Sequence, residues 1–365
     1  MTPLDELATI LKPAAAGLYL VSTGRAEQQA LQRSLYRVST DAEVERAFRR
    51  NLEKVASARG VVLGIPSDVG AGFQRGANLG PQAIRARLLE DDADWPAKLE
   101  AMGVVDLGDV FVVPQLLHDD MLSAAQLAQT RAALYPGLGE SLPVSPLSIA
   151  ERAWTLLFSL NPRLKPFTLG GDHSTAWPVV RPLDAARRRA PWGIVQSDAH
   201  TDLLQERLGV TYCFATWSWH ANEVLGRAGR LTQVGIRATA RTREHWESTL
   251  GVRQFWASHV RANPDRALDE VLAHVKATGV GGVLFSNDID GTDSRWADAT
   301  GTPEPDGLEP DWLVALIRRL GSEVGLLGGD VMEVAPPLTR TPDSARRTVG
   351  LAARYLRETL AAALS

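Results

Sequence analysis

The stretch GIVQSDAHTDLL, residues 193–204, combines a strand pattern with three side chains that could bind metal or move protons. A run typical of a buried strand, 193–197, leads directly into Asp198, His200 and Asp202. Side chains at alternate positions point to opposite faces only while the chain stays extended. If the chain turns after residue 197, these three side chains can converge on one point.

Three other strand-like runs are followed by similar side chains. In an open α/β sheet, ligand sites lie outside the carboxyl ends of the strands, so residues at these positions are expected to meet at one edge. They are Asp172 and His173 after 166–169, Asp288, Asp290 and Asp293 after 281–287, and Asp330 and Glu333 after 324–329.

Several carboxylates gathered at one edge would repel one another unless a cation lies among them. Imidazole and carboxylate together suit Mn, Fe, Co, Ni or Zn better than Ca or Mg. Two histidines and at least four aspartates are too many for one tetrahedral ion, whereas a pair of metals about 3.5–4 Å apart would use them all. Each motif alone could be a helix cap, as at Asp172. Together they favour a binuclear metal centre.

The elements that must position these residues follow an alternating pattern. Short apolar runs alternate with helix-like segments, which predicts an α/β fold of three α/β/α layers with a mainly parallel sheet of about eight strands. The expected strands are 61–65, 103–107, 166–169, 193–197, 231–235, 253–256, 281–287 and 324–329. The expected helices include 81–90, 123–134, 148–160, 264–279 and 311–321.

The pattern divides the 365 residues into two parts. Residues 1–58 precede the first strand and are helix-prone, so we expect a helical N-terminal extension that packs on the core or on a neighbouring subunit. Residues 59–365 are expected to form the catalytic domain.

Charge and composition argue against several classes of partner. The net charge is -4 and basic residues are not clustered, which is unlike a nucleic-acid-binding surface. No apolar stretch approaches the ~20 residues that span a bilayer, and the N-terminus does not resemble a secretory signal. Cys213 is the single cysteine, so no intrachain disulfide can form. We therefore expect a cytoplasmic protein with a small-molecule substrate.

The motifs resemble those of the ureohydrolase family, which includes arginases, agmatinases, guanidinobutyrases, formimidoylglutamases and guanidine hydrolases. GGDHS, DAHTD and SNDIDGTD are similar to its three metal motifs and occur in the same order. The stretches 64–85, 299–308 and 328–337 resemble its signature near the N-terminus and its late loops. The resemblance extends from about residue 60 to the C-terminus and implies an arginase-like fold.

The resemblance also implies roles for individual residues. One ion would be held by His173, Asp198, Asp202 and Asp288, and the other by His200, Asp198, Asp288 and Asp290. Manganese is favoured, with nickel, cobalt or iron as alternatives. A hydroxide shared by the metals would attack the guanidino carbon of the substrate and release urea and an amine. Asp202 would orient that hydroxide, and Glu333 would pair with the substrate guanidinium. Family members are commonly homotrimers or homohexamers.

The loop 211–224, TYCFATWSWHANEV, departs from the family pattern. If FATW aligns with the family's HGTW, Phe214 stands where the family has a proton-carrying histidine. His220 could replace that histidine, or it could be a structural residue at a helix start. Trp217 is a candidate substrate-binding residue, although it and the other loop tryptophans, Trp219 and Trp296, could equally be core or subunit-contact residues.

A second departure concerns the substrate. Arginases place an asparagine after the DAHTD element to hold the α-carboxylate of arginine, whereas Leu203 and Leu204 follow here. Two functions remain open. The first is hydrolysis of an agmatine-, guanidino acid- or guanidine-like compound other than arginine. The second is a catalytically impaired metal-binding relative with a binding or structural role.

Overall fold

A computed structural model describes residues 1–138, 141–187, 190–341 and 343–365. In these ranges nine strands form one sheet in the order β1-β3-β2-β4-β9-β8-β5-β6-β7, parallel throughout except for the antiparallel pair of β1 and β3. The α/β fold with a mainly parallel sheet is confirmed, and each of the eight predicted strands is present. The strands are β1 (Leu11–Lys12), β2 (Gly60–Ile65), β3 (Val104–Val110), β4 (Lys165–Gly170), β5 (Gly193–Ser197), β6 (Leu231–Val234), β7 (Arg253–Phe255), β8 (Val283–Asn287) and β9 (Leu326–Val331).

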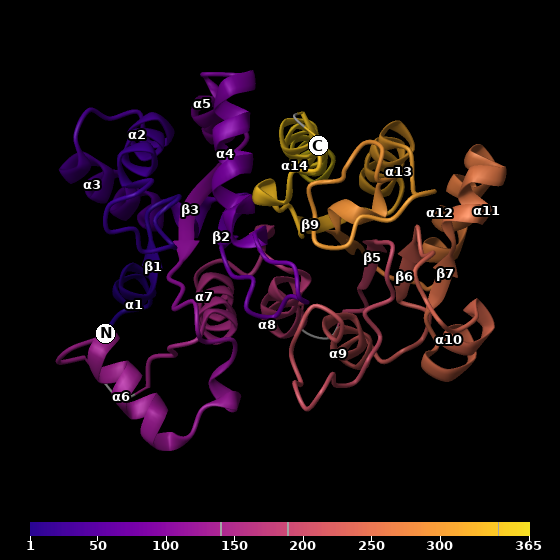
Figure 1. The fold of residues 1–365 in the computed structure, drawn as a ribbon, viewed down its shortest axis with the longest axis horizontal. Helices are drawn as coiled ribbons and strands as arrows, with labels where there is room; N and C mark the ends of the chain where they lie inside the picture. Colours follow the sequence, from indigo (N-terminus) through magenta and orange to yellow (C-terminus); the bar gives the residue numbers. More distant parts are fainter. Residues whose placement is uncertain (139–140, 188–189, 342) are drawn as a thin grey trace.

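Helices cover both faces of this sheet, as its continuously apolar strands require. In Figure 1, α7, α8 and α9 lie below the sheet, and α4, α13 and α14 lie above it. Along α14, Val349, Ala352, Leu356 and Leu360 recur every three or four residues, so one stripe of the helix packs into the core. The helices are α1 (Pro3–Ile10), α2 (Arg25–Tyr36), α3 (Asp41–Glu53), α4 (Gly80–Asp91), α5 (Trp95–Ala101), α6 (Ala124–Leu134), α7 (Pro146–Leu160), α8 (Val180–Ala186), α9 (Trp217–Val224), α10 (Arg243–Leu250), α11 (Ala257–Ala262), α12 (Pro264–Ala277), α13 (Pro310–Glu323) and α14 (Ser344–Leu364).

The first 58 residues are mostly helical and pack on the rest of the chain. Leu7, Ile10 and Phe48 are buried in the same apolar cluster as α7 and β2. The two-residue strand β1 extends the sheet by pairing Leu11 with Val110. Thr40 starts α3 with a reciprocal cap, in which Glu43 returns the hydrogen bond. The division of the chain at residue 58 stays a prediction.

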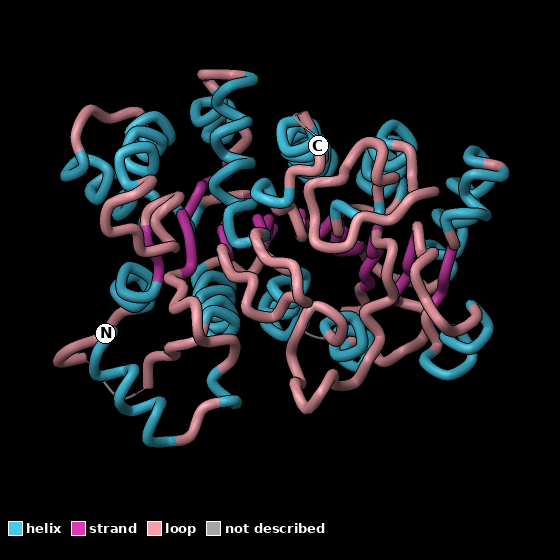
Figure 2. The backbone as a smooth tube through the Cα atoms, in the orientation of Figure 1, coloured by secondary structure: helices cyan, strands magenta, loops and turns pink. Residues whose placement is uncertain are grey.

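The strand order places the candidate site. β4, β9, β8 and β5 are consecutive in the sheet, so the loops after these four strands leave one stretch of its edge. Loops, drawn in pink, occupy the centre of the view in Figure 2. The sequence suggested that Asp330 follows the strand. This prediction was wrong, because β9 continues to Val331 and Asp330 lies inside it. None of the helices in the described ranges combines the length and apolar character needed to cross a bilayer.

Candidate metal centre

The six predicted ligands come from three of the four central strands. His173 begins a short 3-10 helix, η4 (His173–Val179), shortly after β4. Asp198, His200 and Asp202 follow β5. Asp288 caps the short 3-10 helix η5 (Ile289–Gly291) after β8, with its side chain accepting from the backbone N–H of Asp290 at 2.9 Å. These local turns direct the side chains toward one another at the sheet edge, and all six are buried except the partly exposed His200.

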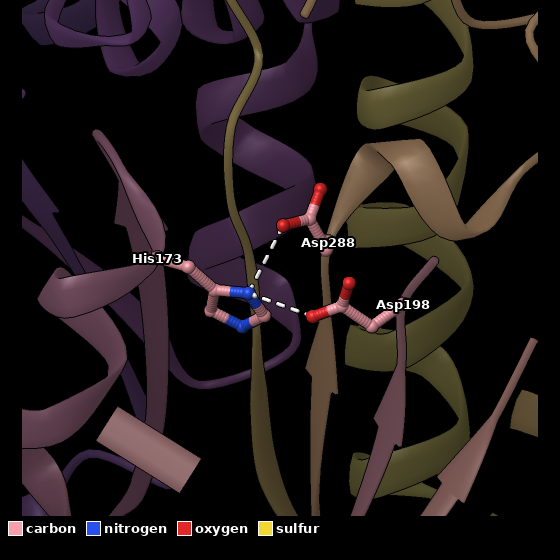
Figure 3. A group of neighbouring side chains, drawn as sticks. All are labelled: His173, Asp198 and Asp288. Atoms are coloured by element: carbon pink, nitrogen blue, oxygen red, sulfur yellow. Dashed lines mark ion pairs between the residues drawn. The ribbon is translucent and has the colours of Figure 1, made fainter. Parts of the chain in front are cut away.

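Three carboxylates surround a single ring nitrogen of His173. Nδ1 lies 3.1 Å from Asp198 Oδ2, 3.3 Å from Asp202 Oδ2 and 3.0 Å from Asp288 Oδ2. Figure 3 shows the carboxylates of Asp198 and Asp288 converging on this nitrogen from two strand ends. Two ligand atoms at right angles on an ion with bonds of about 2.1 Å would lie about 3.0 Å apart. The three distances therefore fit side chains that could share one ion.

The other ring nitrogen of His173 shows which tautomer is present. Nε2 lies 3.1 Å from Ser286 Oγ, and the Ser286 hydroxyl donates to Asp330 Oδ1 at 3.0 Å. Because the hydroxyl proton is directed to Asp330, Ser286 must accept from Nε2–H. In a neutral ring, which metal binding requires, Nδ1 would then turn its lone pair toward three carboxylates. Such an arrangement is repulsive without a cation, and metal-binding histidines commonly donate their other ring N–H to an oxygen in this way.

A second cluster shares one carboxylate with the first. His200 Nδ1 lies 3.1 Å from Asp290 Oδ2 and 3.6 Å from Asp198 Oδ1. Asp198 therefore offers one oxygen to each histidine, as a bridging ligand would. Gln196 fixes this carboxylate by donating to Oδ2 at 2.7 Å. Bridging by Asp288 stays a prediction, because its contact to a histidine is with His173.

In both clusters the buried carboxylates stabilise positive charge on the neighbouring histidine. Burial would lower the pKa of His173, but hydrogen bonds to the three aspartates outweigh it and raise that pKa well above its usual value. Burial also opposes charge on His200, whereas Asp290 and Asp198 raise its pKa to about 12. Burial and then the charge of Asp198 raise the pKa of Asp202 to about 6. Carboxylates this close hold either protons or cations, and the donor set fits a pair of divalent ions.

Two of the candidate catalytic residues have left-handed backbones. The φ angles are 52° at Asp202 and 61° at Glu333. For a residue other than glycine this conformation costs on the order of 1–3 kcal/mol and is found preferentially at functional sites. Glu333 is held in place by its backbone N–H, which donates to Gly171 O at 2.9 Å. Its Oε1 accepts from the backbone N–H of His173 at 2.9 Å.

The second carboxylate oxygen of Glu333 faces the loop at Gly301. A Cβ built on that glycine would lie 3.8 Å from Glu333 Oε2. Burial, together with the charge of Asp172, raises the pKa of Glu333 well above its usual value. A buried carboxylate held beside the ligand cluster is suited to pair with a cationic group.

Trp217 contacts two of the predicted ligands. Its Nε1–H donates to Asp202 Oδ2 at 3.0 Å, and its ring centroid lies 4.6 Å from that of His173. With 1% of its surface exposed, Trp217 holds the ligands in position. Contact between Trp217 and substrate stays a prediction. No local pattern signals the pairing of Trp217 with Asp202, which lies 15 positions away.

The other residues singled out in this loop lie in an aromatic environment. His220 Nε2 lies 3.0 Å from the carbonyl oxygen of Thr211, and its ring packs between Tyr212 and Trp219 at centroid distances of 4.9 Å. Burial lowers the pKa of His220. Within the described ranges no hydrogen bond or ion pair joins His220 to a predicted ligand, and its catalytic role stays a prediction. Phe214 lies under the guanidinium of Arg207, with 4.9 Å from Cζ to the ring centroid.

Comparison with known proteins places these residues in a family. The model of the arginase family matches residues 58–362. The chain is 31% identical to an agmatinase of Chromobacterium violaceum, over 75% of this chain and 76% of that protein. It is 29% identical to a guanidinobutyrase of Pseudomonas aeruginosa, over 76% and 79% of the two chains. The structure of an agmatine ureohydrolase of Thermoplasma volcanium superposes with a TM-score of 0.62 and 27% identity, covering 84% of this chain and 90% of that one.

Proposed function

Because this chain belongs to the arginase family, a family of ureohydrolases, we propose that it hydrolyses a C–N bond of a guanidino compound other than arginine at a centre of two divalent ions. The observation that carries the proposal is the convergence of three carboxylates on Nδ1 of His173. The names of two relatives, agmatinase and guanidinobutyrase, support a guanidino substrate.

The proposed ions take the ligand sets described above. One is held by His173, Asp198, Asp202 and Asp288, and the other by His200, Asp198, Asp288 and Asp290. The mixture of imidazole and carboxylate favours manganese, with nickel, cobalt or iron as alternatives. When bound, such a pair lowers the pKa of a water molecule into the neutral range and supplies a nucleophile.

The chain's own residues would orient the reactants. Glu333 pairs with the substrate guanidinium, and two parallel hydrogen bonds would fix the plane of the carbon that is attacked. Asp202 orients the attacking water through Oδ1, since Oδ2 is held by Trp217. The near-complete burial of Asp202 and Glu333 excludes bulk water, which strengthens each of these charge interactions. The products would be urea and an amine.

The loop residues bear on the choice of substrate. Leu203 and Leu204 offer no side-chain amide for the α-carboxylate of arginine, which supports a guanidino compound of another kind. Phe214 cannot carry protons, so the rival function is a catalytically impaired metal-binding relative. A cytoplasmic location and assembly as a homotrimer or homohexamer stay predictions.

The test is urea release from a panel of guanidino compounds after loading the protein with Mn²⁺ or Ni²⁺. We expect Glu333→Gln to lower kcat/KM at least about 100-fold, because the buried negative charge that pairs with the guanidinium is lost. Metal content of this variant should be unchanged. Glu53→Gln, which removes the same charge from an exposed position in α3, is the matched control.

Two results would count against the proposal. Near-normal activity of Glu333→Gln would mean that the guanidinium is held elsewhere. A fully metal-loaded protein that releases urea from no compound in the panel would favour the impaired relative.

A further inference from the structure

A cavity of about 500 Å³ lies between loops in the region of the metal centre. Three segments line it: the first loop after β2 at 69–73, the stretch 115–122, and residues 207–214 of the loop that precedes α9. Its walls are mainly apolar, with Val69, Leu117, Val210 and Phe214 among them. A space of this size, with few polar groups, is typical of a site for a small organic molecule.

Gly70, which lines the cavity, also packs against residues that flank His173. A Cβ at this position would lie 2.5 Å from Ser174 Oγ and 2.9 Å from Asp172 Oδ1, so only glycine permits this approach to the residues flanking His173. On the same residue, the carbonyl oxygen accepts from the backbone N–H of Phe214 at 3.1 Å.

A second lining residue also lies close to the centre. Cys213 lines the cavity and is buried. Four positions later in the same loop, the Trp217 indole N–H donates to Asp202 Oδ2 at 3.0 Å, so the loop that carries Cys213 reaches a predicted ligand. A Cβ on Gly301, which faces Glu333 Oε2, would also lie 3.7 Å from the carbonyl oxygen of Gln74, directly after lining residue Phe73, so the cavity lies beside the part of the site that holds Glu333.

One cation stands at this cavity without a counter-charge. The guanidinium of Arg207 lies over the Phe214 ring, and among the described residues it forms no ion pair with an aspartate or glutamate. None of the described residues that line the cavity is acidic. The other titratable base there, His118, has a pKa lowered by burial, and its Nδ1 accepts from the backbone N–H of Asp120 at 3.2 Å. The charge that this cavity complements is therefore negative.

We propose that the cavity receives the part of the substrate beyond the guanidinium, and that Arg207 binds a terminal carboxylate there. The substrate class is then the ω-guanidino carboxylic acids. The inference rests on the proposed function, because Glu333 must hold the other end of the molecule. Apolar walls would contact the methylene groups between the two charged ends.

The same arrangement selects against a diamine-derived substrate. Agmatine is cationic at both ends, so its ammonium would be placed beside Arg207 without a carboxylate to offset the repulsion. Specificity of this kind depends as much on the disfavoured partner as on the favoured one. Arg207 is thus a specificity-determining residue, contributed by an exposed loop position.

The test compares three compounds with the same four-carbon chain: 4-guanidinobutyrate, agmatine and butylguanidine. Wild-type protein loaded with Mn²⁺ should show the highest kcat/KM for the acid and the lowest for agmatine. In Arg207→Gln, the ratio of kcat/KM for the acid to that for butylguanidine should fall about tenfold, as expected for loss of a charge-assisted hydrogen bond. Arg207→Glu should shift the preference toward agmatine. Arg163→Gln removes an equal charge just before β4, at the opposite edge of the sheet, and should leave the ratio at its wild-type value.

The outcomes separate this inference from the function on which it rests. Urea release that favours agmatine or butylguanidine over the acid, or an unchanged ratio in Arg207→Gln, overturns the inference and leaves the hydrolase intact. If none of the three compounds is cleaved, calorimetric binding of 4-guanidinobutyrate and butylguanidine decides the inference, and the proposed function fails only if no other compound of the guanidino panel is cleaved either. Tighter binding of the acid that is lost in Arg207→Gln supports it, and equal binding of the two compounds overturns it.

Discussion

Replacing Ser286 with alanine should weaken metal binding while leaving the fold in place. Its Oγ accepts from His173 Nε2–H and donates to Asp330 Oδ1, so the substitution removes both hydrogen bonds. The Nε2–H would then lack its partner in a fully buried site, and the imidazole would lose the contact that fixes its orientation. Asp330 would still accept from the backbone N–H of Asn287 at 2.9 Å, so its carboxylate should stay where it is.

The expected magnitude follows from the kind of contact that is lost. Removing a partner that orients a metal-binding histidine typically lowers metal affinity about 10–100-fold. At 1.4 kcal/mol for each tenfold step, that corresponds to about 1.4–2.8 kcal/mol of binding free energy. Asp330→Asn should have a smaller effect, because the amide oxygen can still accept from Ser286.

The assay is an equilibrium competition between metal-free protein and a chromogenic chelator for Mn²⁺ or Ni²⁺. Ser197→Ala is the matched control, since Ser197 immediately precedes a predicted ligand and its buried Oγ has no hydrogen-bond partner in the described ranges. That control should bind metal with wild-type affinity. Wild-type affinity in Ser286→Ala, or an equal loss in Ser197→Ala, would refute the reasoning.

Three further predictions concern the same centre. Trp217→Phe keeps a ring against His173 but loses the hydrogen bond to Asp202, so metal affinity should fall about tenfold in the same competition assay, whereas Trp246→Phe should bind as wild type. His220→Ala tests the predicted catalytic role: a proton carrier predicts a fall in kcat of about 100-fold at nearly unchanged KM. An unchanged kcat with a lower thermal unfolding midpoint would make His220 a structural residue of the aromatic cluster. Metal binding at pH 7 should release protons. Although burial opposes it, Asp290 and Asp198 raise the pKa of His200 to about 12, so an incoming ion must displace the proton on this ring. Calorimetry in buffers of different ionisation enthalpy measures the release, and a binding enthalpy that is the same in every buffer would contradict it.

The predicted ligands could be found from the sequence because their positions depend on local patterns. Each lies within a few residues of a strand end, and a parallel sheet brings such ends to one edge. Asp198, His200 and Asp202 are the clearest case, since a single turn after β5 brings all three to the cluster.

The contacts that hold the ligands could not be found in this way. His173 and Ser286 are 113 positions apart, and Ser286 and Asp330 are 44 apart, so their hydrogen bonds depend on the order of β4, β9 and β8 in the sheet. No local pattern specifies that order. The hydrogen bond from Trp217 to Asp202 likewise depends on how the loop before α9 folds back over the centre.

Two differences in the strands have physical causes. The predicted strand 324–329 ends at Gly329, whereas β9 continues through Asp330 to Val331. In β9 Gly329 allows close packing, since a Cβ there would lie 2.7 Å from the carbonyl oxygen of Phe285. β1 has two residues, too few for a strand pattern to be recognised, and depends on its pairing with β3.

The central claim is that six side chains from three strand ends hold a pair of divalent ions. The most direct test is the number of ions per chain, measured by elemental analysis after saturation with Mn²⁺ and removal of loosely bound metal, with anomalous X-ray scattering to locate them. Two ions within the cluster formed by His173, His200 and their aspartates are predicted. Fewer than about one ion per chain, or ions located away from this cluster, would contradict the account.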